Sequence, residues 1–147
     1  MSRILALFVG GLSGLLMAVQ GAMNAGAAKT IGLWEASFVV HSLGTVVSVA
    51  ALLLAQKGLG GLQHIGEAPW YFYLGGPVGV AIVYAVMVAV NRVGMVNATT
   101  AIVAAQLLTA AVVDHFGLFA AEQISFRWFK IIGVVLIAIG ARILLAK

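Results

Sequence analysis

Cysteine is absent from this chain of 147 residues, and only 8% of its residues are charged. Without cysteine the chain has no disulfide, no thiolate nucleophile and no cysteine-ligated metal. No nucleophile with a neighbouring base and no phosphate-binding loop is found either, so we expect neither an enzyme nor a metal or other cofactor. The eight basic residues are scattered and form no patch, which argues against nucleic acid as a partner despite the formal net charge of +4.

Hydrophobic residues make up 63% of the chain, which would leave a soluble protein with an apolar surface. Uncharged apolar runs recur along it, and roughly 20 such residues span a bilayer as a helix. The first run also fits a secretory signal peptide, but Gln20 and Asn24 within it favour a retained membrane helix. The sequence therefore predicts an all-α integral membrane protein in the lipid bilayer, with one five-helix transmembrane domain over residues 1–147 and helices at about residues 4–28, 36–56, 70–91, 98–119 and 128–145.

Lysine and arginine are evenly divided between the two sides of the membrane, and their imbalance normally sets orientation. With neither side in excess, we expect insertion in both orientations, although a short chain can balance by chance, or the pair before the fifth helix can dominate locally. Four basic residues lie on the side of the N-terminus (Arg3, Lys57, Arg127 and Lys130) and four on the other (Lys29, Arg92, Arg142 and Lys147).

Five crossings place the two termini on opposite sides of the membrane, so a second copy in the opposite orientation forms an inverted repeat. Five helices are few for enclosing a solute pathway, whereas two antiparallel copies supply ten. We therefore expect an antiparallel homodimer, or a heterodimer with an oppositely oriented paralogue.

Polar side chains on the predicted helices are candidates to line a pathway or bind substrate. Side-chain amides inside a bilayer face either a neighbouring helix or a cavity, and both alternatives remain open here. The histidine of the second helix is either a packed, hydrogen-bonded imidazole or a proton or ligand site. The candidates are Ser13, Gln20, Asn24, His41, Tyr84 and Gln106.

Pro77, within the stretch LGGPVG, removes a helical hydrogen bond and is flanked by glycines that permit bending. It marks either a broken helix at a binding site or a site of packing. Glycine pairs on other helices predict packing or dimerisation faces: Gly10 with Gly14, and Gly133 with Gly140.

Asp114 and His115 lie side by side near the end of the fourth helix, where Gly117 is a candidate C-cap. A negative charge in the last turn interacts unfavourably with the helix dipole, so another interaction or a function must account for its presence. Three explanations remain open: an ion pair with Lys57 or Arg127, a hydrogen-bonded structural corner, or a protonatable coupling site.

Three stretches resemble the YdcZ-type family of bacterial inner-membrane exporters, within the drug/metabolite transporter superfamily. They are GLSGLLMAVQGAMNAGAAKTIG (Gly11 to Gly32), PWYFYLGGPVGVAIVY (Pro69 to Tyr84) and TTAIVAAQLLTAAVVDHFGLF (Thr99 to Phe119). The resemblance covers nearly the whole chain and implies a multi-pass protein of the bacterial inner (cell) membrane. It places Gln20, Asn24, Gln106, Asp114 and His115 on polar positions of the family.

The related small multidrug resistance proteins use a glutamate in the first helix to couple protons to cation export. This first helix has no acidic residue, so such coupling and cationic substrates are not expected. We expect an exporter of an unidentified small polar or amphipathic molecule, drug-like or metabolite, that works by alternating access in a dual-topology dimer. The alternative is a non-transporting small subunit or assembly factor of a larger membrane complex.

Overall fold

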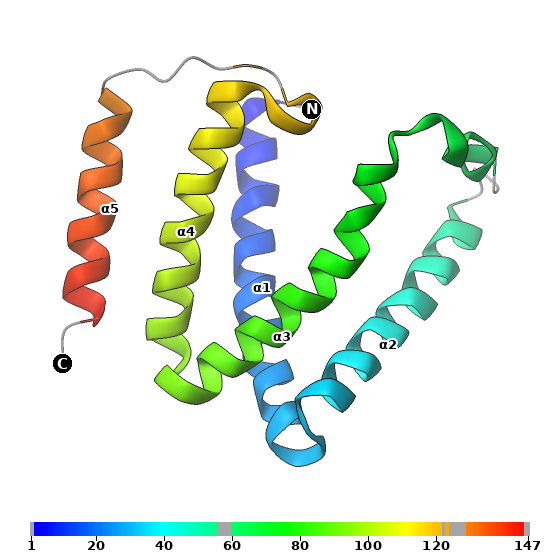
Figure 1. Cartoon of the computed structure of the whole chain (residues 1–147), viewed down its shortest axis with the longest axis horizontal. Coiled ribbons are helices and arrows are strands. Elements are labelled where there is room, and N and C mark those ends of the chain that lie inside the picture. The colour runs from blue at the N-terminus through cyan, green and yellow to red at the C-terminus, as the bar shows by residue number, and fades with distance from the viewer. Residues whose placement is uncertain (1, 56–59, 122, 124–128, 146–147) are drawn as a thin grey trace. The chain divides into compact units, whose positions relative to one another are not determined.

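The structure is a computed structural model of the whole chain, and it describes residues 2–55, 60–121, 123 and 129–145 (Figure 1). Helices form all the regular structure of these residues, and no strand occurs among them. The all-α prediction is confirmed for this part of the chain. In order, the elements are α1 (Arg3–Ile31), α2 (Leu33–Leu54), the 3-10 helices η1 (Gly60–Glu67) and η2 (Trp70–Leu74), α3 (Gly75–Val93), α4 (Met95–Phe116), the 3-10 helix η3 (Leu118–Ala120) and α5 (Phe129–Leu145).

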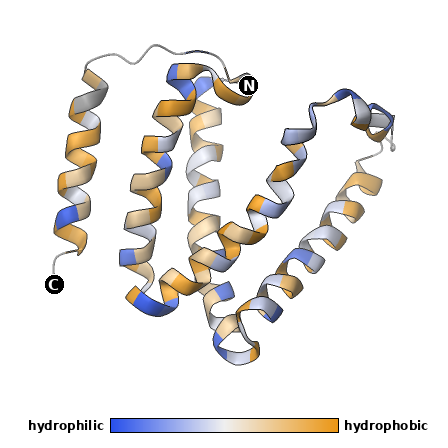
Figure 2. Ribbon diagram, in the orientation of Figure 1, coloured by the Kyte–Doolittle hydropathy of each residue, from blue (hydrophilic) through white to orange (hydrophobic). Residues whose placement is uncertain are grey.

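Four described segments are long and apolar enough to cross a membrane: α1, α2, the combined stretch Trp70–Val93, and α4. A fifth apolar helix, Ile132–Leu145 within α5, is shorter. Figure 2 shows hydrophobic residues along most of α4 and α5 and hydrophilic residues gathered at η1. The predicted helix ends at residues 56 and 128 lie outside the described residues.

Glycines with positive φ end three of the helices. Gly32 (φ 101°) separates α1 from α2, Gly94 (φ 85°) separates α3 from α4, and Gly117 (φ 61°) caps α4. The prediction that Gly117 is the C-cap of the fourth helix is confirmed, and the α-helix therefore ends at Phe116 and not at residue 119. The predicted boundaries at residues 28, 36 and 98 were wrong, because each helix runs to the nearest glycine that leaves the right-handed region. A Cβ at Gly32 would also collide with the carboxylate of Glu35.

The third helical segment begins at Trp70, as the sequence predicted, but its first residues are not α-helical. Residues Trp70–Leu74 form the 3-10 helix η2, and the α-helical part starts at Gly75. Pro77 is therefore the third residue of α3, in the first turn, where a backbone N–H has no partner within the α-helix. Proline is tolerated at this place without a break in the helix.

The chain divides into two compact units, Met1–Asn91 and Arg92–Lys147. In the first unit, α1, α2 and α3 meet around a small core of Ala28, Ala36 and Met87. Alanine side chains allow helix backbones to approach closely, which matters in lipid, where burial from water does not drive helices together. In the second unit, α4 and α5 lie side by side. The expected single transmembrane domain stays a prediction.

Candidate functional site

An open groove runs along one face of α2, and we call it the α2 groove. It consists of two adjoining parts of about 320 and 410 Å³, which share His41 and Thr45. Both apolar and hydrogen-bonding side chains line it. The first part is lined by Trp34, Ser37, Phe38, His41, Ser42, Thr45 and Val80, and the second by His41, Gly44, Thr45, Ser48, Val49 and Leu52.

His41 lies where the two parts of the α2 groove join, and its side chain is half-buried. Its Nδ1 is 2.8 Å from the carbonyl oxygen of Ser37. A carbonyl only accepts hydrogen bonds, so Nδ1 carries the hydrogen and donates it. The other ring nitrogen, Nε2, points toward α3, where a Cβ added to Gly79 would lie 3.9 Å from it. The hydrogen bond from Nδ1 orients the imidazole, and the absence of a side chain at Gly79 leaves room beside Nε2.

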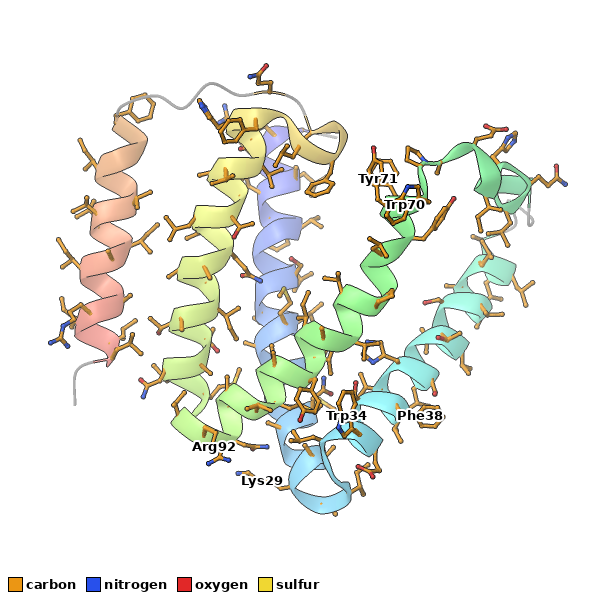
Figure 3. The ribbon with its side chains drawn as sticks, viewed as in Figure 1. Lys29, Trp34, Phe38, Trp70, Tyr71 and Arg92 are labelled. Atoms are coloured by element: carbon orange, nitrogen blue, oxygen red, sulfur yellow. The ribbon has the colours of Figure 1, made fainter. Side chains whose placement is uncertain are left out.

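The side chain of Trp34, on α2, contacts α3 at one end of the α2 groove (Figure 3). Its ring centroid lies 4.5 Å from that of Tyr84, with the rings tilted by 32°. Aromatic pairs at this separation stabilise a fold by more than the burial of their surface area alone would. The contact therefore holds Tyr84, a predicted pathway residue, next to the groove lining.

Buried polar atoms occur in the same unit. The side chain of Ser37 is only 2% exposed, and its Oγ has no hydrogen-bond partner among the described residues. Within the same described part of the chain, Oδ1 of Asn91 is likewise buried and unpartnered. Asn24 is 8% exposed. A buried polar group left without a partner costs about 1–3 kcal/mol, so the unpaired atoms of Ser37 and Asn91 are energetically expensive.

Other predicted pathway residues do not line the α2 groove. Ser13 and Gln20 are exposed on α1, and the hydroxyl of Ser13 donates to the carbonyl oxygen of Gly10 at 2.8 Å. Gln106 is exposed on α4, in the second unit. Sequence reasoning missed Thr45, although it follows His41 by one helical turn. Whether any of these residues binds solute stays a prediction.

The predicted packing glycines have no close neighbour in the described part of the chain. A Cβ added at any of them would meet nothing within 4 Å. Their role in dimerisation therefore stays a prediction too. They are Gly10, Gly14, Gly133 and Gly140.

Asp114 is half-buried in the last turn of α4, and His115 beside it is exposed. The backbone carbonyl of His115 accepts a hydrogen bond of 3.1 Å from the side chain of Gln123, which links the end of α4 to the segment that follows it. Among the described residues Asp114 makes no ion pair; its predicted partners Lys57 and Arg127 lie outside them.

A comparison with protein-family models matches residues 5–143 to the family described as "Putative inner membrane exporter, YdcZ". Comparisons with curated proteins and with solved structures gave no match. The matched range contains the whole α2 groove and every candidate residue named above. The chain therefore belongs to the YdcZ family, and it is a multi-pass protein of the inner membrane.

Proposed function

We propose that the protein exports a small polar or amphipathic solute by alternating access, as an antiparallel homodimer. The observation that carries this proposal is the α2 groove. Polar side chains lie there in the middle of a helix that is long and apolar enough to span a bilayer. Polar groups at this depth face protein or a water-filled cavity, because contact with hydrocarbon is costly.

The size and lining of the α2 groove also suit a small ligand. Pockets for small molecules usually have volumes of about 300–1,000 Å³ and combine an apolar wall with a few polar groups. The groove has both components, with Phe38, Val49 and Leu52 beside the polar side chains. One copy offers only an open groove, and a second copy would close it.

The antiparallel arrangement follows from the charge balance and the odd number of expected helices. Two copies in opposite orientations present the same groove to opposite sides of the membrane, related by an axis in the membrane plane. Exchange of conformation between the two copies then moves the opening from one side to the other. A paralogous chain in the opposite orientation would serve the same geometry as a heterodimer.

Export is tested by comparing the medium of cells that produce the protein with that of cells that do not. We expect at least one small solute to accumulate outside the producing cells, as measured by untargeted mass spectrometry. Cells producing an unrelated five-helix membrane protein at the same level control for leakage. Identical media would contradict export and favour a non-transporting subunit.

Replacing Asp114 by asparagine tests whether this carboxyl couples export to protons. We expect Asp114→Asn to leave export running but to remove its dependence on external pH, because the amide keeps the shape and cannot titrate. The measurement is the rate of solute release at acidic and alkaline external pH. Glu35→Gln, the same change in the first turn of α2, should keep the wild-type dependence. A pH dependence that survives in Asp114→Asn would exclude the coupling role.

A further inference from the structure

Three polar side chains of the α2 groove donate their hydrogens to backbone carbonyl oxygens of α2 itself. The ring nitrogen Nδ1 of His41 donates to the carbonyl oxygen of Ser37 at 2.8 Å. The hydroxyl of Thr45 donates to the carbonyl oxygen of His41 at 2.9 Å, and that of Ser48 to the carbonyl oxygen of Gly44 at 2.8 Å. What each side chain can still offer is an acceptor: Nε2 when the imidazole carries a single hydrogen, and the lone pairs of the two hydroxyls.

These acceptors form a row along the groove. Positions 41, 45 and 48 fall on one face of a helix, because they follow one another at i, i+4 and i+7. A rise of about 1.5 Å per residue separates them by about 6 Å and about 4.5 Å along the axis. Both Thr45 and Ser48 are exposed, so the row is open to a ligand. We call these three groups the acceptor row.

Among the residues that the structure describes, no lysine, arginine or carboxylate side chain lines the α2 groove, whose other walls are largely apolar. A cationic ligand would find no carboxylate to replace its water shell, and an anionic ligand would find no lysine or arginine. An anion would also be repelled by the lone pairs of the acceptor row. The lining therefore favours an uncharged ligand, since a desolvated charge is costly unless it is paired.

Ser37 places an unpaired hydroxyl beside the groove. Its side chain lines the groove, is 2% exposed, and has an Oγ without a hydrogen-bond partner among the described residues. The hydroxyl has almost no exposed surface, so a ligand in the groove would reach it only after a shift of the side chains that cover it.

We propose that the α2 groove binds an uncharged, amphipathic solute carrying at least two hydroxyl or N–H donors, spaced about one helical turn apart on an apolar body. The donors bind the acceptor row, and the apolar body lies against Phe38, Val49 and Leu52. The inference names the substrate class of the proposed exporter and rests on that function for its role in transport.

The test uses three probes built on one ring: trans-1,4-cyclohexanediol, its dimethyl ether, and trans-1,4-diaminocyclohexane. Saturation-transfer NMR with the full-length protein in lipid nanodiscs measures their binding. We expect binding of the diol alone, because the ether has no donor and the diamine is charged. Equal binding of diol and ether, preferred binding of the diamine, or no binding of the diol would each overturn the proposal.

Thr45→Val removes one acceptor while keeping the shape of the side chain. Loss of one hydrogen bond should weaken diol binding about fivefold. Thr100→Val is the matched control, since the hydroxyl of Thr100 makes the same backbone bond, to the carbonyl oxygen of Val96 at 2.8 Å, but lies on α4. If both variants bind the diol equally well, the acceptor row is not the site.

The outcomes of this test and of the export assay are separable. Diol binding that depends on Thr45, combined with unchanged media, would leave the site standing and reject export. Export without diol binding would reject the inference and leave the proposed function standing.

Discussion

Replacing Ala36 by leucine should destabilise the first unit by about 1–3 kcal/mol, the usual cost of adding methylene groups to a packed site. The side chain of Ala36 is 0% exposed and lies in the core with Ala28 and Met87. A leucine would have to push α2 away from its neighbours. In lipid the added apolar surface brings no compensating gain, because helix association there depends on close packing.

The effect is measured as the fraction of protein that stays monodisperse after heating in detergent, by size-exclusion chromatography. Ala51→Leu is the matched control: it makes the same change on the same helix at an exposed position. The monodisperse fraction of Ala36→Leu should disappear at a clearly lower temperature than that of Ala51→Leu. Equal thermal stability of the two variants would show that the site has room for a larger side chain and that the core is assigned wrongly.

A single cysteine added after Lys147 should be labelled in about half of the molecules when intact cells meet a membrane-impermeant thiol reagent. The native chain has no cysteine to obscure the result. The expectation follows from the predicted topology, which has four basic residues on each side of the membrane and so favours neither orientation. Labelling of all or none of the molecules would mean one fixed orientation, and would point to a paralogous partner chain or to a non-transporting subunit.

Two charge variants should convert this mixture into single orientations. Gln56→Lys with Gln63→Lys raises the count on the N-terminal side from four to six, and Arg3→Gln with Lys57→Gln lowers it to two, against four on the other side. The positive-inside rule then places the C-terminal cysteine outside in the first variant and inside in the second. Each variant alone should lose export, and both produced together should restore it.

Restoration by the pair is the decisive arm of this experiment. An antiparallel dimer needs one copy in each orientation, so two oppositely biased populations rebuild it. Full export by either biased variant alone would contradict the antiparallel dimer, because all its copies would share one orientation.

The candidate site was only partly predictable from the sequence. His41 and Tyr84 stand out as polar residues in apolar helices, and both lie at or beside the α2 groove. Thr45 was missed because a lone threonine in an apolar helix is equally compatible with packing. Only its hydrogen bond to the carbonyl of His41 and its place in the groove distinguish it.

The membrane location, the all-helical class and the end of α4 at Gly117 were determined by the sequence alone. These properties are local: an apolar run of sufficient length and a glycine in the left-handed region act through neighbouring residues. The sequence did not reveal the 3-10 start at Trp70, because hydropathy does not distinguish two helices of the same composition.

Contacts between distant segments were decided by the tertiary structure. Three such contacts join residues of different helices. They are the core of Ala28, Ala36 and Met87, the ring pair of Trp34 and Tyr84, and the approach of Gly79 to His41. Periodicity assigns a residue to a face of its own helix, but it does not say which helix covers that face. That choice depends on how side chains of matching size fit together, and the shape of the α2 groove follows from it.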